Sequence, residues 1–152
     1  MDSQDSFFQL ASQRHSCRRY ADDSIAEEMI AQIIETAQLA PASKGKDSSQ
    51  YVVVDDNDLL LQLSQCKPFG ASFVKHASHA IVVVGRPEIS DVWIENASIA
   101  ATFIMMQAES LGLGACWVQV REREDAETKV KTLLNLPVTS RVLCIISLGI
   151  MQ

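Results

Sequence analysis

A chain of 152 residues, 47% hydrophobic and 21% charged, is long enough for one domain that buries a sizeable core. Its formal net charge of −6 at pH 7 argues against nucleic acid as a partner, because neutralising phosphates requires clustered Lys and Arg. No apolar run approaches the roughly 18 residues that a membrane span requires, which argues against a membrane protein.

Hydrophobic periodicity and turn residues predict one domain over residues 1–152. Helical spacing of apolar residues marks the helices, and short β-branched or apolar runs mark the strands. In chain order, the patterns predict helices over 6–12, from 24 to just before Pro41, from 57, over 91–111 and over 125–136, and strands over 50–55, 80–84, 115–120 and 141–148.

Two helix starts carry a capping signal. Ser24 followed by Glu27 is a capping-box pattern, in which each side chain bonds a backbone N–H group near the other residue. Asn57 is expected to cap the next, shorter helix.

Two predicted elements have the composition of buried structure. The strand over 80–84 is wholly apolar, so we expect it to be buried on both faces. The helix over 91–111 is apolar nearly all round and carries small residues that allow another helix to approach closely. It is therefore either a core helix or a helix at a dimer interface.

The order of the elements leaves two architectures open. Helices alternate with strands, which is typical of parallel βαβ units in a doubly wound sheet. An α+β sandwich with a mixed sheet has the same order of elements.

The cysteines predict neither a metal site nor a disulfide framework. The four cysteines form no CxxC pair, and no His lies at metal-ligand spacing from them. Free thiols and an N-terminus without a signal-peptide pattern favour a reducing, cytoplasmic location.

Familiar nucleotide-binding and nucleophile motifs are missing. Gly112 and Gly114 lie between a helix and a strand, the reverse of the dinucleotide fingerprint, and no third Gly follows at the required spacing. No Walker motif and no G-x-S-x-G elbow occurs.

The segment from Arg14 to Tyr20 contains the most informative cluster of polar residues. Arg14 and Arg18 are four positions apart with Ser16 between them. Guanidinium groups offer forked donors that match phosphate oxygens, and Ser adds a neutral donor. The segment is therefore a candidate phosphate site, and the alternative is a solvated basic turn.

Two further segments permit a close approach of backbone to a flat ligand. One is the loop over 40–46, which is rich in small residues after Pro41. The other is the stretch over 111–118, where Trp117 is either a core residue or a ligand contact.

Together the three segments resemble the nitroreductase family of FMN-dependent oxidoreductases over nearly the whole chain. The family motif R-[RH]-S-x-[RK]-x-[FY] is matched by Arg14, His15, Ser16, Arg18 and Tyr20. Pro41, Ala42, Ser43 and Gly45 stand where the family has the loop A-P-S-S-x-N, and the family segment L-G-L-G-x-x-W-I is nearly intact over residues 111–118. Residues 133–137 and 146–149 look like the family's L-L-G-L-P and I-x-L-G.

The resemblance implies a three-layer α/β/α sandwich of the α+β class with a mixed, mostly antiparallel sheet. It also implies a homodimer that passes electrons from NAD(P)H to a nitroaromatic, quinone or similar acceptor in a ping-pong cycle, with the chemistry on FMN. The implied flavin contacts are Arg14, His15, Ser16 and Arg18 at the phosphate and ribityl chain, Pro41, Ala42, Ser43 and Gly45 from the partner subunit, and Trp117, Val118 and Gln119 by the ring. The alternative is a weakly active or inactive flavin-binding dimer of the same fold.

Several positions depart from the family pattern. The Asn of the family loop is Gly45, its Pro is Ser48 and its Trp is Ser49, so a polar flavin contact is expected to be absent there. Gln119 stands where Gly is common, and its bulk is expected to alter access to the ring. The sequence ends at Gln152, so one phosphate contact from a C-terminal tail is also expected to be missing.

Overall fold

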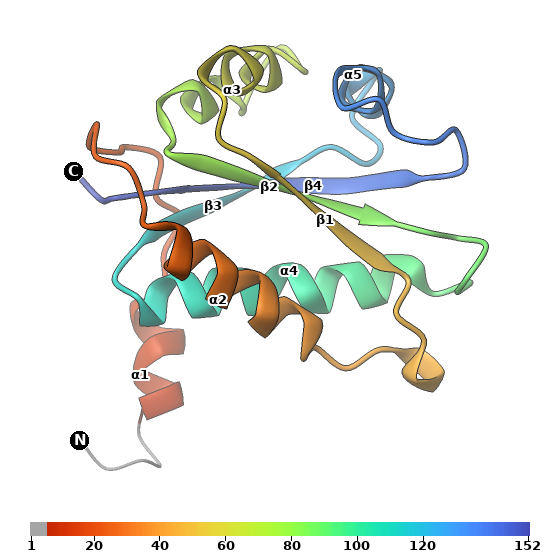
Figure 1. Ribbon diagram of the computed structural model, residues 1–152, viewed down its shortest axis with the longest axis horizontal. Helices are drawn as coiled ribbons and strands as arrows, with labels where there is room; N and C mark the ends of the chain where they lie inside the picture. Colours follow the sequence, from red (N-terminus) through yellow and green to blue (C-terminus); the bar gives the residue numbers. More distant parts are fainter. Residues whose placement is uncertain (1–5) are drawn as a thin grey trace.

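The computed structural model describes residues 6–152, which fold into three layers (Figure 1). A four-stranded sheet in the order β1-β2-β4-β3 forms the middle layer. Its strands are β1 (Ser49–Val54), β2 (His79–Gly85), β3 (Gly114–Gln119) and β4 (Arg141–Gly149). One face is covered by α2 (Glu27–Gln38) and α4 (Trp93–Ser110), and the other by α3 (Asn57–Ser64) and α5 (Ala126–Leu133).

Each pair of neighbouring strands is antiparallel. The doubly wound alternative is therefore wrong, and the α+β sandwich is confirmed. Parallel pairing within residues 6–152 is limited to one isolated bridge between Ser16 and Ala115, so "mixed" overstates the parallel share of the sheet.

The sheet separates two hydrophobic cores. Ile81 and Val83 face α2 and α4, whereas Val82 and Val84 face α3 and α5. Every residue of β2 is buried, which confirms the expectation of a strand covered on both faces. α4 also lies in the core, because it buries Trp93, Asn96, Ala97, Ala100, Ala101, Ile104 and Ala108.

Both capping expectations are wrong. The residue that precedes α2 is Ala26, which makes no side-chain cap, and the Glu27 carboxylate points instead to His79. At α3 the cap is Asp56, whose side chain accepts from the Leu59 N–H group at 3.0 Å, one residue earlier than Asn57. Asp and Asn side chains both serve as helix N-caps, so the tertiary path of the chain decides between the two positions.

Two other elements differ from their predicted ranges by two residues or more. α4 begins at Trp93 instead of residue 91, and α5 ends at Leu133 instead of residue 136. Asn135 has a left-handed backbone with φ 53°, which ends the helical path after α5. No helix in residues 6–152 is long and apolar enough to cross a bilayer.

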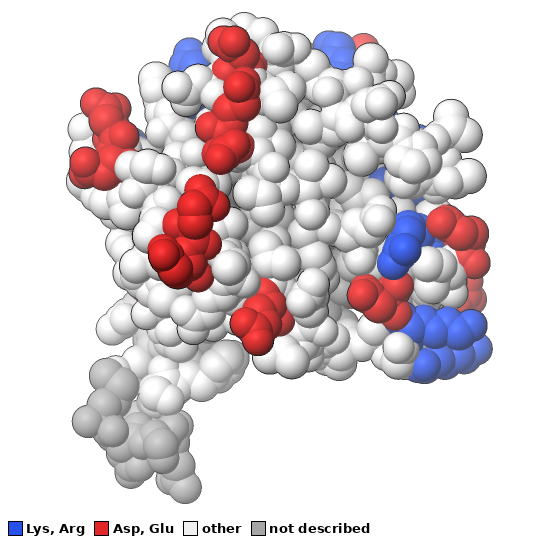
Figure 2. Space-filling model, in the orientation of Figure 1, with Lys and Arg blue, Asp and Glu red and all other residues white. Residues whose placement is uncertain are grey.

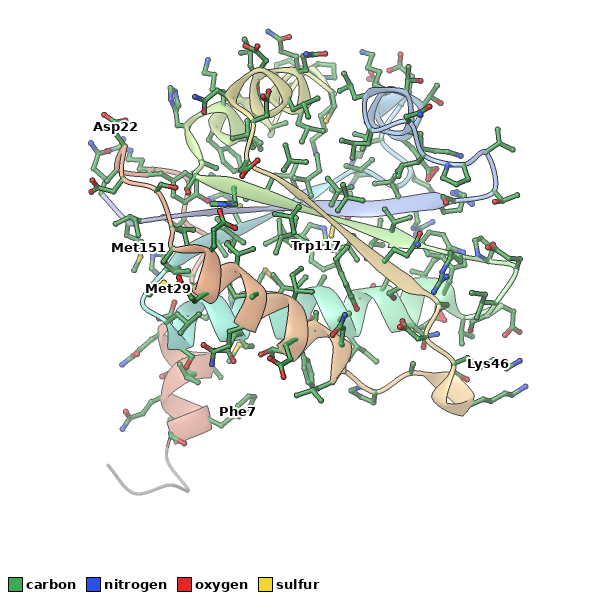
Figure 3. The ribbon with its side chains drawn as sticks, in the orientation of Figure 1. Phe7, Asp22, Met29, Lys46, Trp117 and Met151 are labelled. Carbon is green, nitrogen blue, oxygen red and sulfur yellow. The ribbon has the colours of Figure 1, made fainter. Side chains whose placement is uncertain are left out.

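The first helix, α1 (Ser6–Gln13), buries none of its residues. Phe7 and Phe8 are 67% and 74% exposed, and Figure 3 shows the Phe7 side chain pointing into open space. Two adjacent exposed aromatic rings give this helix an apolar surface that the other described residues leave largely uncovered.

Candidate functional site

The basic segment that follows α1 lies along the outer edge of β3. The Cys17 N–H group donates to the Ala115 carbonyl at 2.9 Å, next to the bridge between Ser16 and Ala115. An edge strand has unpaired backbone groups, and this pairing satisfies one of them. The segment is thus fixed to the sheet at its centre, while the side chains around that point stay at the surface.

Tyr20 secures the far end of the segment. Its hydroxyl donates to the Cys17 carbonyl at 2.6 Å and hydrogen-bonds the Ser147 hydroxyl at 2.7 Å. The ring packs on Gly149, where a Cβ atom would lie 2.4 Å from Cδ1 of Tyr20. Burial raises the pKa of Tyr20, so the hydroxyl stays protonated as a hydrogen-bond donor. The aromatic position of the motif is therefore structural.

The segment carries three guanidinium groups, on Arg14, Arg18 and Arg19. Arg14 is half-buried, and Arg18 and Arg19 are exposed. Within residues 6–152 no carboxylate forms an ion pair with any of the three. Arg18 lies over the Phe73 ring at 5.9 Å from its centroid, which holds the side chain close to the surface of the protein. These cations are available to an external anion.

Lys67 joins this basic region from the opposite side of β3, and nothing in the sequence pattern indicated it. Its Nζ donates to the Gln119 carbonyl at 2.7 Å, although the two residues are 52 positions apart. Burial raises the pKa of the Cys116 thiol, while Arg18, a hydrogen bond from Ser16 and the charge of Lys67 lower it. Ser16, Arg18 and Lys67 therefore all favour the charged form of the Cys116 thiol.

The end of β3 presents a fixed polar arrangement. The Trp117 indole N–H donates to Oε1 of Gln119 at 2.8 Å, and Nε2 of Gln119 donates to the Arg121 carbonyl at 2.9 Å. Both side chains are half-buried, and Trp117 packs on the α4 side of the sheet (Figure 3). The bulk of Gln119 is thus held in one orientation.

Val118 differs from its two neighbours, because its side chain is 1% exposed and belongs to the core under α3 and α5. It can offer a ligand only its backbone. The Ala115 carbonyl points away from β4 toward Cys17, so strand alternation directs the backbone groups of Trp117 to the same outer edge.

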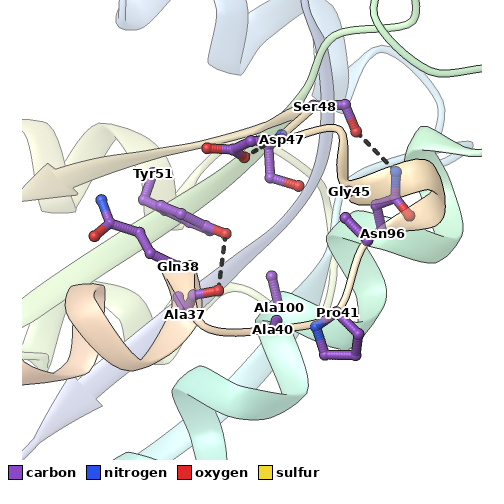
Figure 4. Close-up of a pocket in the computed structure, with 12 residues that line it drawn as sticks. Ala37, Gln38, Ala40, Pro41, Gly45, Asp47, Ser48, Tyr51, Asn96 and Ala100 are labelled. Atoms are coloured by element: carbon purple, nitrogen blue, oxygen red, sulfur yellow. Dashed lines mark hydrogen bonds between the residues drawn. The ribbon is translucent and has the colours of Figure 1, made fainter.

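The loop over 40–49 borders a cavity of about 360 Å³ at the other end of the sheet (Figure 4). Pro41, Ala42 and Gly45 line it, together with the small side chains of Ser48 and Ser49. Ser43–Gly45 forms a single 3-10 turn, η1.

The turn has an unusual backbone, because Lys44 and Gly45 both have positive φ, at 57° and 65°. A Cβ at Gly45 would meet nothing within 4 Å, so the backbone conformation, and not crowding, favours Gly there.

Asn96 on α4 fixes the shape of this loop. Its Oδ1 accepts from the Ser43 N–H group at 3.0 Å, and its Nδ2 donates to the Ser48 hydroxyl at 3.0 Å (Figure 4). Nδ2 also donates to the Ser90 hydroxyl at 3.2 Å. Asn96 is 5% exposed, and its bonds to Ser48 and Ser90 are buried, whereas its bond to the exposed Ser43 is partly buried. Sequence reasoning missed this residue, because an Asn inside a helix gives no local sign of a distant partner.

One chain does not bring the two predicted halves of the site together. The loop leads into β1 and the basic segment covers β3, and these strands are the opposite edges of the sheet. At about 4.8 Å per strand, the edges are roughly 14 Å apart. A ligand that contacts both segments needs the loop of a second copy, so the joint site stays a prediction.

Comparisons with known proteins give one consistent result. The chain matches the sequence model described as Nitroreductase family over residues 11–65 and 58–150. A protein of Archaeoglobus fulgidus named "Putative NADH dehydrogenase/NAD(P)H nitroreductase" is 34% identical over 140 residues, which cover 90% of this chain and 80% of that protein.

Solved structures agree with the sequence match. An FMN-dependent nitroreductase from Clostridium difficile R20291 has a TM-score of 0.94 and 42% identity, with 95% of this chain and 87% of that chain covered. A nitroreductase family protein from Clostridium novyi NT has a TM-score of 0.89 and 25% identity, with 96% and 85% covered.

Proposed function

We infer that this chain, which belongs to the nitroreductase family, is an FMN-dependent oxidoreductase that works as a homodimer. In our proposal it passes electrons from NAD(P)H to a nitroaromatic, quinone or similar small acceptor in a ping-pong cycle. The names of its relatives support a flavin enzyme that oxidises a nicotinamide. The acceptor class and the kinetic order are our own extension.

The observation that carries the proposal is the unpaired basic segment on the edge of β3. Arg14, Ser16 and Arg18 lie around a strand edge with no carboxylate paired to either guanidinium within residues 6–152. Such a set fits a phosphomonoester, because charge-assisted donors are satisfied only when an anion arrives. The residues present therefore fit the phosphate end of FMN.

Bound FMN would supply the redox chemistry, taking a hydride from the nicotinamide and delivering electrons to the acceptor. The chain's own residues bind, orient and shield. Arg14, Ser16 and Arg18 would hold the phosphate, with Lys67 as a further cation. His15 is exposed and its Nδ1 lies 3.2 Å from the Gln13 carbonyl, so its Nε2 would make the polar contact. The fixed Gln119 side chain would limit the space beside the ring.

A homodimer would complete this arrangement. Pro41, Ala42, Ser43 and Gly45 would reach the ring of the partner's FMN, because they lie too far from their own basic segment. The exposed Phe7 and Phe8 on α1 supply an apolar surface that a second copy can bury. We propose a cytoplasmic location, where buried free thiols such as those of this chain stay reduced.

The test is to titrate the purified protein with FMN, and then to measure turnover with NADH, NADPH and a dinitroaromatic under air. We expect flavin fluorescence to change at micromolar FMN, and turnover to exceed that of free FMN well beyond error. No change of fluorescence at tens of micromolar FMN contradicts the proposal.

A second candidate is a flavin-binding dimer without activity. The departures at Gly45, Ser48 and Ser49 favour it. Ser48 and Ser49 are smaller than the Pro and Trp of the family loop, and both line the cavity beside the loop. Saturable FMN binding with turnover no greater than that of free FMN would select this candidate over the enzyme.

A further inference from the structure

Three potential metal ligands meet where α2 begins, β1 ends and β2 begins. Glu27, Asp55 and His79 each offer one atom, and these atoms lie within 4.8 Å of one another. The three residues come from elements far apart in the sequence, which Figure 1 shows side by side at one end of the sheet. Neither the cysteines nor the flavin contacts belong to this cluster.

His79 is the unusual member, because it is 1% exposed and its Nε2 is buried without a hydrogen-bond partner. That atom is directed at the carboxylates, 3.5 Å from Oε1 of Glu27. Burying a ring nitrogen without a hydrogen-bond partner lowers the stability of the folded state. The orientation of the His79 ring therefore calls for an explanation, such as a bound ion.

The other ring nitrogen of His79 is held by the protein. Nδ1 lies 2.8 Å from the Ser78 hydroxyl, which accepts from the Ile25 N–H group at 2.9 Å. When Nδ1–H donates to the Ser78 oxygen, Nε2 carries the free lone pair. Metal-ligating histidines are oriented by such a bond from their second nitrogen.

The surroundings of the cluster favour a cation. Asp22, Asp23 and Asp55 line a cavity of about 440 Å³ beside it, and Lys75 and His76 line the same cavity. Figure 2 shows acidic side chains gathered on this side of the molecule. Glu27 and Asp55 are exposed, so a hydrated ion can reach both carboxylates from solvent.

We propose that Glu27, Asp55 and His79 bind a divalent transition-metal ion, for which Zn²⁺ is the probe. With metal–ligand bonds of about 2.1 Å, two ligands of a tetrahedral site are about 3.4 Å apart, and the Glu27 and His79 atoms are separated by 3.5 Å. The exposed Asp55 carboxylate closes the remaining gap by side-chain rotation, and water fills the fourth position. An imidazole ligand favours Zn²⁺ and its neighbours over Mg²⁺ and Ca²⁺.

Such an ion would join the start of α2 to two strands of the sheet. It would stabilise the folded state by an amount that grows with the logarithm of the free ion concentration above Kd, since the three ligands are brought together only by folding. The proposal does not depend on flavin binding, so its test uses protein without added FMN.

The experiment is isothermal titration of chelator-treated protein with Zn²⁺, accompanied by thermal unfolding with and without Zn²⁺. We expect one equivalent to bind and to raise Tm. Glu27→Gln and Asp55→Asn each remove one exposed ligand and are expected to weaken binding about tenfold or more. Glu28→Gln and Asp58→Asn, which change exposed carboxylates outside the cluster, are the matched controls and should bind as the parent does.

Co²⁺ provides a second readout of the ligands. Bound Co²⁺ should give visible bands without a sulfur-to-metal charge-transfer band, and should broaden the NMR signals of the His79 ring. A sulfur band would place the ion on a cysteine and overturn the proposal. The absence of binding at millimolar Zn²⁺, or equal affinity in all four variants, would overturn it as well.

Discussion

The hydroxyl of Tyr20 lies 2.7 Å from the hydroxyl of Ser147, so the basic segment is joined to the interior strand β4 as well as to the edge strand β3. The same hydroxyl donates to the Cys17 carbonyl at 2.6 Å. Arg18 and Arg19 lie between these two fixed points, at residues 17 and 20. Buried hydrogen bonds within the protein thus help to set the positions of these two cations.

Tyr20→Phe tests this relationship. The change leaves the Ser147 hydroxyl and the Cys17 carbonyl short of a partner, so we expect the free energy of unfolding to fall by about 1–2 kcal/mol. FMN affinity should fall by a few-fold, because the basic segment becomes less fixed. Urea unfolding and FMN titration measure the two effects. The matched control is Tyr51→Phe, which removes a longer bond of 3.4 Å to Ala37 and should cost less stability. Equal losses in the two variants would count against a special role for Tyr20.

Replacing the guanidinium groups tests the phosphate site. Arg14→Gln and Arg18→Gln should each weaken FMN binding by about tenfold or more, because each removes a charge-assisted contact worth roughly 1.5–3 kcal/mol. Arg19→Gln serves as the control, since Arg19 is exposed in the same segment but lies outside the Arg14, Ser16 and Arg18 pattern. Fluorescence titration at fixed ionic strength gives the dissociation constants. A larger effect at Arg19 than at Arg18 would refute the assignment.

Lys67 should contribute a charge that depends on pH. Burial lowers the pKa of its ammonium group, so Lys67 loses its proton at a lower pH than an ordinary lysine does. The ratio of FMN affinities between the parent and Lys67→Gln should therefore be greatest near neutral pH and fall toward one as the pH becomes alkaline. FMN titrations across this range measure it. A ratio of one at every pH would remove Lys67 from the site.

Gly45→Asn restores the amide that the family loop carries at this position. Gly45 has φ 65°, a conformation that Asn adopts more readily than most residues, and a Cβ there meets nothing within 4 Å. We expect the variant to fold with nearly unchanged stability and to bind FMN several-fold more tightly. Gly45→Ala is the control, because it adds a Cβ without an amide. Equal FMN affinity in the Asn and Ala variants would show that the loop makes no such contact.

Asn96→Ala should loosen the loop over 40–49. The Ser43 N–H group and the Ser48 and Ser90 hydroxyls lose their partner in a buried place, so the cost is expected to be about 2–3 kcal/mol. Hydrogen exchange of the Ser43 amide should accelerate more than exchange in β2. Ser98→Ala, on the same helix, removes a bond to the Ile94 carbonyl within the helix and should leave the loop protected. Unchanged exchange at Ser43 in Asn96→Ala would contradict the role assigned to Asn96.

The local pattern of residues predicted the five α-helices and four strands that the structure shows in residues 6–152. It also predicted that β2 is buried on both faces. It also supplied the three segments that resemble the nitroreductase family, since those motifs are contiguous in the chain. Contiguous patterns are readable because periodicity and turn chemistry act within a few residues. Helix starts were predicted less well: both expected caps were wrong, at Ser24 and at Asn57, because the path of the chain before the helix selects the capping group.

By itself the sequence determined which segments are helix or strand, and where the guanidinium groups of the basic segment stand along the chain. Only the tertiary structure decided that the strands run antiparallel in the order β1-β2-β4-β3, which separates the loop from the basic segment. It also brought Lys67 to Gln119, Asn96 to Ser43 and His79 to Glu27. These pairs are more than 50 positions apart, and packing of the whole domain, not local spacing, determines which distant side chains meet.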